Sequence, residues 1–286
     1  MDKLALSSGP YRAVATLDGG GLLEFSRQEK AGMRHILRPA SQEPLGPLDR
    51  AMIVMAPWCN RIGGGGFTSG ARFHPIAPNI SGFPMPLHGT AFQSGWDLVE
   101  HREDRVSLTL DASGPGPGPF RYRAALTYRL SNEQLSVELR LTNTTLEDLP
   151  FGIGLHPWFV CDEETRLQFV STSMVISDAS GLPTHVEPLV DDFIKPRNLP
   201  EGRVDNTFLG WTGTAWLHHG DGSVGLQSSA PMLHVFSPQA SAGFCCLEPS
   251  TAPPNAPNYA PSNRKDLGSG EVISVTAAIF CDGSVT

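Results

Sequence analysis

The chain has 286 residues, of which 40% are hydrophobic and 17% are charged, and its formal net charge is −8. This composition supplies enough apolar side chains for a buried core and excludes an intrinsically disordered chain. Lys and Arg form no cluster, which argues against nucleic acid or a membrane as a partner, because both are bound by basic surfaces. A small neutral ligand suits this charge better.

The five cysteines do not suggest a disulfide framework, because their number is odd, two are adjacent and no C-x-x-C occurs. The N-terminal segment becomes polar at Ser7, before the apolar core of a signal peptide could develop. The sequence also lacks a run of ~20 apolar residues that could span a membrane. These features predict a cytoplasmic protein.

Alternation of apolar and polar residues predicts strands along the whole chain. The first expected hairpin joins 13–17 to 22–26 through Asp18-Gly19-Gly20-Gly21. A strand at 106–110 precedes the clearest pattern, in which every second residue is apolar from 120 to 130 and again from 135 to 141. The polar turn at 131–134 makes this pair an antiparallel hairpin with one buried face. Further strands are expected at 167–171, 174–177, 214–218, 223–227, 232–236, 243–247 and 272–280.

An all-β fold follows from these strands, since no segment of a dozen residues shows a helical apolar period. Strands do not alternate with helices, so a parallel sheet is disfavoured, and one antiparallel β-sandwich or barrel is expected. The Gly/Pro-rich segment 113–119 is short and lies between two strands, which favours a hairpin loop over a domain linker. We therefore expect a single domain over residues 1–286.

Several common catalytic motifs are missing. None of the nine histidines forms H-E-x-x-H, and neither G-x-S-x-G nor a phosphate-binding glycine motif occurs. The sequence therefore predicts neither a metal site nor a cofactor site.

Candidate functional residues lie in separated segments in which Pro or Gly accompanies a polar side chain. His and Glu are well suited to proton transfer near neutral pH, and Arg, Asp and Asn to hydrogen bonds with sugar hydroxyls. Pro and Gly mark strand ends and loops, where binding sites on β scaffolds tend to lie. The candidates are Asn60 and Arg61, His88 before Gly89, His156 before Pro157, Asp205 before Asn206, and Glu248 before Pro249.

The joint order of these segments resembles the aldose 1-epimerase (galactose mutarotase) family. The matching motifs are Asn60-Arg61-Ile62, Leu87-His88-Gly89, Gly154-Leu155-His156-Pro157-Trp158-Phe159 and Glu248-Pro249-Ser250-Thr251. Trp158 stands where the family usually has tyrosine. The resemblance implies a large antiparallel β-sandwich with an open cleft that binds a sugar.

The resemblance also implies a role for each residue. Glu248 corresponds to the general base and His156 to the general acid. His88 and Arg61, with Asn60 beside it, correspond to residues that position the sugar, and Asp205 to one that holds its hydroxyls.

The implied reaction is the interconversion of the α and β anomers of an aldose by ring opening and reclosure. Glu248 takes the proton of the C1 hydroxyl, and a protonated His156 gives one to the ring oxygen. A carboxylate beside an imidazolium favours both charged forms, so these groups are expected to titrate as a coupled ion pair.

Two alternatives remain open at this point. A hexose-6-phosphate 1-epimerase would need a cationic phosphate partner, for which Arg61 or Arg72 are candidates. A non-catalytic sugar-binding or sensing protein could use the same fold without the chemistry.

Overall fold

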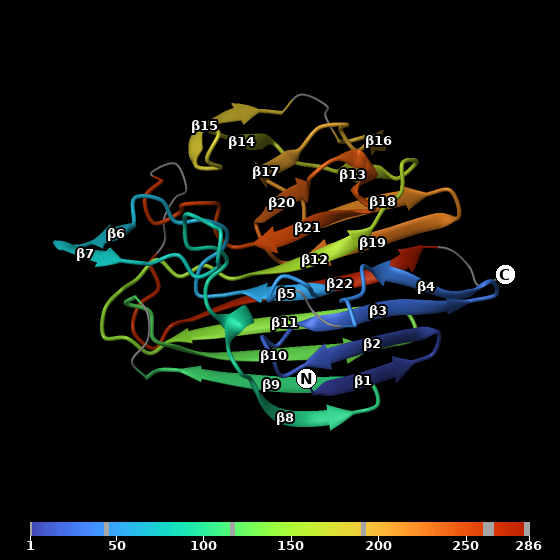
Figure 1. Ribbon diagram of the computed structural model, residues 1–286, viewed down its shortest axis with the longest axis horizontal. Coiled ribbons are helices and arrows are strands. Elements are labelled where there is room, and N and C mark those ends of the chain that lie inside the picture. Colours follow the sequence, from blue (N-terminus) through green and yellow to red (C-terminus); the bar gives the residue numbers. More distant parts are fainter. Residues whose placement is uncertain (1, 43–45, 115–117, 190–192, 260–265, 283–286) are drawn as a thin grey trace.

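A computed structural model describes residues 2–42, 46–114, 118–189, 193–259 and 266–282 (Figure 1). About half of the described residues lie in strands of two large antiparallel sheets, which together form a β-sandwich. The expectation of a large all-β sandwich is therefore confirmed. The helices of the described part are two 3-10 turns, at Ala91–Gln93 and Ala240–Ala242, and neither is long and apolar enough to cross a membrane.

The first large sheet has eleven strands and carries His156, Asp205 and Glu248. Its order is β1 (Lys3–Ser8), β2 (Tyr11–Thr16), β3 (Leu22–Glu29), β4 (Gly32–Leu37), β12 (Gly154–Val160), β21 (Phe244–Ser250), β20 (Met232–Ser237), β17 (Val204–Leu209), β14 (Ser173–Ser177) and β15 (Pro183–Pro188), with β5 (Met52–Met55) paired to β3 and β12.

The second large sheet has nine strands. Its order is β16 (Arg197–Asn198), β13 (Arg166–Phe169), β18 (Thr214–His219), β19 (Gly222–Ser228), β22 (Val272–Asp282), β11 (Gln134–Asn143), β10 (Tyr122–Leu130), β9 (Arg105–Ala112) and β8 (Asp97–Arg102). A separate hairpin of β6 (Gly66–Ser69) and β7 (Arg72–Pro75) projects at one end of the molecule (Figure 1).

The hairpin predicted from the alternating residues is formed by β10 and β11, with Leu126 opposite Leu139. Its apolar side chains face the sandwich core because successive residues of a strand point to opposite faces of the sheet. The loop expected at 113–119 joins β9 to β10, which pair as a hairpin, although 115–117 lie outside the described residues.

Two tyrosines tie the sheets together across the core. The hydroxyl of Tyr128 on β10 donates a hydrogen bond to the carbonyl of Gly20 in the other sheet's β2–β3 turn, at 2.6 Å. The hydroxyl of Tyr11 on β2 accepts one from the amide of Cys281 on β22, at 3.3 Å. Both tyrosines are almost fully buried, so these bonds satisfy polar atoms that the core would otherwise leave unpaired.

A glycine holds the loop that carries His88. Gly89 has φ +76°, and a Cβ there would overlap the carbonyl oxygen of Ala56 on the adjacent segment. The side chain of Asn79 fixes the same loop by donating to the carbonyls of Leu87 and Gly89, at 2.9 and 2.7 Å. Position 89 therefore requires glycine both for its backbone angle and for this close approach.

We expect Gly89→Ala to destabilise the protein by at least about 2 kcal/mol, because left-handed backbone angles cost a non-glycine residue roughly 1–2 kcal/mol and the clash adds to this. Gly95→Ala is the matched control, since a Cβ at Gly95 meets no atom within 4 Å. Urea unfolding of both variants measures the difference, and equal stability would contradict this role of Gly89.

Candidate functional site

The central strands of the eleven-stranded sheet place titratable side chains side by side. His156 lies on β12, Glu248 on β21, His234 on β20 and Asp205 on β17, and these strands are successive neighbours. His234 pairs directly with Glu248. The pairs Gly154–Ser250 and Trp158–Cys246 put His156 opposite Glu248 as well. A row of polar side chains therefore crosses four strands.

The alternation of strand side chains separates this row from the core. On β20, Leu233 and Val235 belong to the main hydrophobic core, whereas His234 between them lines a pocket on the opposite face. On β21, Leu247 belongs to the core and Glu248 to the pocket. The pocket thus lies on the face of the sheet that is turned away from the second sheet's core.

His156 and Glu248 lie inside strands, which differs from the expectation that the candidates mark strand ends and loops. The prolines in these motifs explain why the sequence suggested strand ends at both positions. Pro157 follows His156 and Pro249 follows Glu248, and neither residue has an N–H for the ladder. Between the paired positions Gly154–Ser250 and Trp158–Cys246, β12 and β21 form no further ladder pair. The ladder is therefore open where the two catalytic candidates face each other.

Loops supply the other candidates. Asn60 and His88 have φ +53° and +58°, and the amide of His88 donates to the carbonyl of Asn60 at 2.9 Å. Arg61 forms an isolated bridge with Leu87. The loops around 60 and 88 therefore hold each other at the edge of the pocket.

The pocket has a volume of about 290 Å³, at the lower end of the range of ~300–1,000 Å³ for small-molecule sites. All six residues predicted from the sequence as site residues line it, together with residues to which the sequence assigned no role. The predicted residues are Asn60, Arg61, His88, His156, Asp205 and Glu248, and the added ones are Arg38, Leu48, Phe83, Leu87, Trp158, Arg203, His234 and Phe236.

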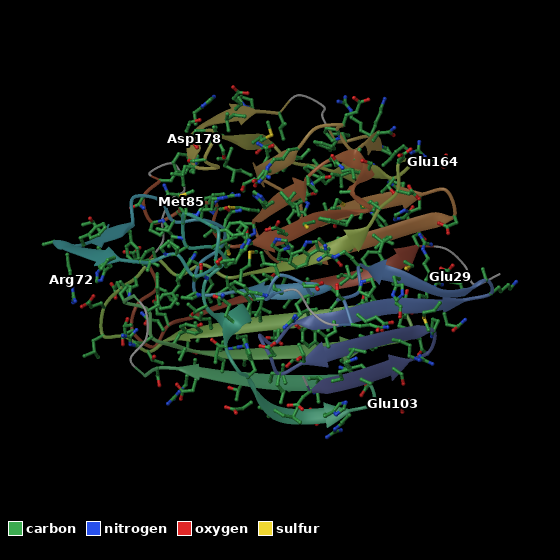
Figure 2. All side chains as sticks on the ribbon, in the orientation of Figure 1. Glu29, Arg72, Met85, Glu103, Glu164 and Asp178 are labelled. Carbon is green, nitrogen blue, oxygen red and sulfur yellow. The ribbon has the colours of Figure 1, made fainter. Side chains whose placement is uncertain are left out.

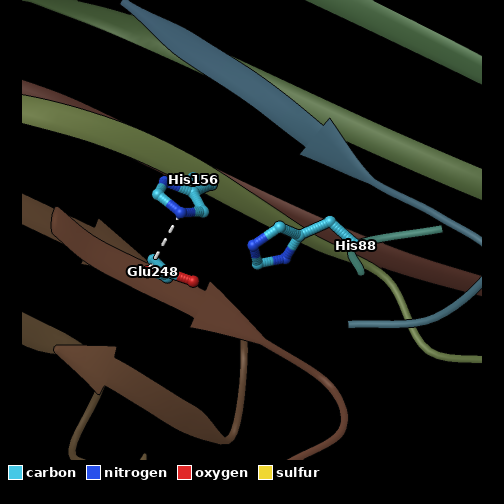
Figure 3. A group of neighbouring side chains, drawn as sticks. All are labelled: His88, His156 and Glu248. Atoms are coloured by element: carbon cyan, nitrogen blue, oxygen red, sulfur yellow. Dashed lines mark ion pairs between the residues drawn. The ribbon is translucent and has the colours of Figure 1, made fainter. Parts of the chain in front are cut away.

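The innermost contact joins His156 Nε2 to Glu248 Oε1 at 3.2 Å (Figure 3). The His156 ring stacks on Trp158 at a centroid distance of 4.0 Å and meets the edge of His88 at 4.9 Å. All of these side chains are buried. The Nδ1 atoms of His88 and His156 have no hydrogen-bond partner among the described residues. A proton on either Nδ1 would therefore be buried without an acceptor.

Burial sets the protonation states of the three groups. It raises the pKa of Glu248 from 4.5 to about 7, although the nearby His234 acts in the opposite direction. It lowers the pKa of His156 well below 6.5 and that of His88 to about 3, and neighbouring histidines lower both further. The expected ion pair of two charged groups is thus not favoured in the free protein. Loss of hydration outweighs the attraction, and the neutral forms are preferred.

A second polar cluster lies beside this pair. His234 is held by Thr207 at 2.7 Å and by Asp205 at 2.9 Å. Asp205 also accepts from Arg61 at 3.0 Å and from Arg203 at 2.6 Å. The pKa of Asp205 is lowered because its bonds to His234 and the two arginines outweigh its burial, and the pKa of His234 is raised by Glu248 and Asp205. The cluster offers fixed donors and acceptors to a hydroxylated ligand.

His234 was missed from the sequence because it belongs to no recognised motif. The available signal was its place between Leu233 and Val235 in an expected strand, which directs it away from the core. Arg38 and Arg203 carried no comparable signal, since an arginine next to a strand is usually a solvated surface residue.

Arg72, one of two arginines considered as a phosphate partner, is remote from this pocket. It lies on β7 in the projecting hairpin (Figure 2). Its side chain is 74% exposed and lies 3.8 Å from Glu147. Arg61 does line the pocket but is already engaged by Asp205.

His88, His156 and Glu248 are also the described residues that could hold a metal ion. One ligand atom from each lies within 4.8 Å of the others. Zinc binds such atoms at ~2.0–2.2 Å in a tetrahedron, so the three side chains would have to move closer together and His156 would have to release Glu248. The arrangement as it stands suits proton transfer better.

Comparison with known proteins gives one consistent result. The aldose 1-epimerase family model matches residues 2–279. The uncharacterized Escherichia coli protein YphB is 28% identical over 263 residues, which cover 87% of this chain and 88% of YphB.

Solved structures share the fold along the whole chain. A candidate aldose 1-epimerase from Escherichia coli K12 superimposes with a TM-score of 0.89 at 25% identity, and the match covers 99% of both chains. A galactose 1-epimerase from Lactobacillus acidophilus has a TM-score of 0.76 at 17% identity, covering 96% of this chain and 92% of its own.

The raised pKa of Glu248 makes a prediction about stability. A rise from 4.5 to about 7 is worth about 3 kcal/mol, at ~1.4 kcal/mol per pKa unit. Because the folded state holds this proton more tightly, the contribution is complete below pH 4.5 and is lost as the pH rises through 7. Glu248→Gln cannot titrate, so we expect wild type to lose up to about 3 kcal/mol relative to the variant between pH 4.5 and 8.

Urea unfolding of both proteins at several pH values measures this difference. A wild type that instead gains stability over the variant as the pH rises would show that Glu248 is an ionised partner of a charged His156.

Proposed function

The chain belongs to the aldose 1-epimerase family, and on that premise we propose that it is a mutarotase that interconverts the anomers of an aldose by acid–base ring opening and reclosure. The observation that carries the proposal is the buried 3.2 Å contact between His156 Nε2 and Glu248 Oε1 at the base of a small polar pocket. Both members of an acid–base pair are thus present, adjacent and shielded from water.

Mutarotation requires two proton transfers at neighbouring oxygens. The C1 hydroxyl must lose a proton while the ring oxygen gains one, and both oxygens are bonded to C1. A base and an acid in mutual contact match this geometry. Glu248 accepts the hydroxyl proton, His156 donates to the ring oxygen, the C1–O5 bond breaks, and rotation about C1–C2 followed by the reverse transfers yields the other anomer.

The pair needs one proton for this cycle. A protonated Glu248 beside a neutral His156 and an ionised Glu248 beside a protonated His156 contain the same number of protons. Transfer of the carboxyl proton to Nε2 interconverts them when the neutral ring carries its own proton on Nδ1, the atom that has no acceptor among the described residues. Burial favours the first form in the free protein. The second form is the reactive one, and a pKa of about 7 for Glu248 keeps the proton mobile near neutral pH.

The surrounding residues orient the sugar. Asp205, Arg61 and His234 hold one another in a fixed geometry, so they can bind ring hydroxyls without reorganising. The neutral His88 ring lies nearly at a right angle to the His156 ring and supports its position. Trp158 and Phe236 provide apolar walls for the C–H face of a pyranose.

We expect Glu248→Gln and His156→Asn each to slow anomer exchange by about 10²–10⁴-fold, the usual contribution of a positioned acid or base. Exchange of the anomeric protons of free aldoses, followed by NMR, measures the rate directly. Glu103→Gln and His101→Asn are the matched controls, because both residues lie at the β8–β9 hairpin outside the pocket.

Near-wild-type turnover in Glu248→Gln would refute the assignment of the base. A folded wild type that binds sugars but accelerates no exchange would favour the non-catalytic sugar-binding alternative.

A further inference from the structure

The pocket is positively charged although the chain as a whole carries a net charge of −8. Its charged residues are Arg38, Arg61 and Arg203 against Asp205 and Glu248. The arginines therefore exceed the acids even when both acids are ionised, and more so when Glu248 holds its proton. A local positive field of this kind attracts an anionic ligand.

Two of the three arginines are already engaged by one carboxylate. Arg61 and Arg203 both donate to Oδ2 of Asp205, at 3.0 and 2.6 Å. Arg203 also stacks over the ring of Phe236, with its guanidinium carbon 5.1 Å from the centroid. These contacts make both side chains part of the cluster that faces the sugar hydroxyls.

Arg38 is different, since its guanidinium forms no hydrogen bond or ion pair with a described residue. It follows the last residue of β4, and its backbone amide donates to the carbonyl of Trp158 at 2.7 Å. The guanidinium carbon lies 5.3 Å from the Trp158 ring and 4.8 Å from that of Phe244. Stacking thus fixes a half-buried guanidinium while leaving its donors available, which suits it to an oxyanion.

The order of contacts along the pocket wall gives the direction of the ligand. Glu248 contacts His156, His156 stacks on Trp158, and Trp158 packs against Arg38. In a pyranose the covalent order is O1, C1, ring oxygen, C5 and C6. With O1 at Glu248 and the ring oxygen at His156, the C6 substituent extends past Trp158 towards Arg38.

There is also room for such a substituent. Arg38 and Leu48 also line a second cavity of about 640 Å³, whose other polar lining residues include Ser41, Asp49 and Asn79. Arg38 therefore borders both cavities, so an enlarged C6 group at Arg38 would lie next to the second cavity.

We propose that the substrate is an aldose carrying an oxyanion on C6, and that Arg38 is the residue that binds this group. The inference rests on the proposed mutarotase function, because the direction of the sugar follows from the roles of Glu248 and His156. A carboxylate, a sulfate and a phosphate share the required chemistry.

The test compares anomer exchange of glucose, glucuronate, glucose 6-sulfate and glucose 6-phosphate by NMR with wild type, Arg38→Gln and Arg38→Lys. We expect at least one anionic sugar to exceed glucose in kcat/KM by tenfold or more. Arg38→Gln should lower that value by about 10–100-fold, the range for a hydrogen bond to a charged group, and lower the value for glucose much less. Arg38→Lys should retain part of the preference.

Arg72→Gln is the control for loss of a positive charge, because Arg72 lies outside the pocket, and it should leave the preference unchanged. The identity of the preferred sugar then distinguishes carboxylate, sulfate and phosphate.

Glucose exchanged as fast as all three anionic sugars, or an equal loss for every sugar in Arg38→Gln, would overturn the inference while leaving the mutarotase function intact. If no sugar is exchanged, calorimetric measurement of the binding of the same sugars distinguishes the two proposals. Binding of anionic sugars that depends on Arg38, without exchange of any sugar, would support the anionic ligand and overturn the mutarotase function. If the protein neither binds anionic sugars nor exchanges any sugar, both the anionic ligand and the mutarotase function would be overturned.

Discussion

The contact between His156 and Glu248 is the constraint on which the rest of the site depends. Two titratable groups lie in the middle of a sheet, almost without access to water, and each would be costly there as an isolated charge. Their proximity allows one proton to serve both. Burial holds the pair neutral in the free protein and keeps the pKa of Glu248 near neutrality, where a proton can leave or return with little change in free energy.

The strands of the sheet hold this buried pair in place. Side chains on one face of β20 and β21 belong to the main core, and those on the other face line the pocket, so the catalytic candidates are carried by strands that are packed into the core. Pro157 and Pro249 interrupt the ladder beside the pair without ending the strands. The loops of Asn60 and His88 close the pocket and depend on each other through a backbone hydrogen bond. Strands supply the groups proposed to transfer protons, and loops complete the enclosure.

Much of the fold was predictable from the sequence because alternation is a local signal. The hairpin at 120–141 is an example, since one face of β10 and β11 is buried and the other is solvated. β12 was not predicted as a strand, because it is buried almost throughout and shows no alternation. The six candidate residues were found through motif order, and the structure brings all of them to one pocket.

What the sequence could not supply was the part of the site that depends on long-range contacts. His234 and Arg38 come from segments that lie far apart along the chain and meet only because β4, β12, β21 and β20 are successive strands. The direction of the pKa shifts could not be predicted from the sequence either, because it depends on how deeply a side chain is buried. Adjacency alone suggested an ion pair, and burial reverses that balance.

The pH dependence of kcat/KM for anomer exchange tests the central claim most directly, since it reports the protonation of the free enzyme. A pair that must contain one proton predicts a bell-shaped profile whose alkaline limb falls near pH 7, where Glu248 loses the shared proton. The limb should disappear in Glu248→Gln along with most of the activity. A rate that rises through pH 7 and stays constant to pH 9 would contradict the account, because it would show that a fully deprotonated pair is the working form.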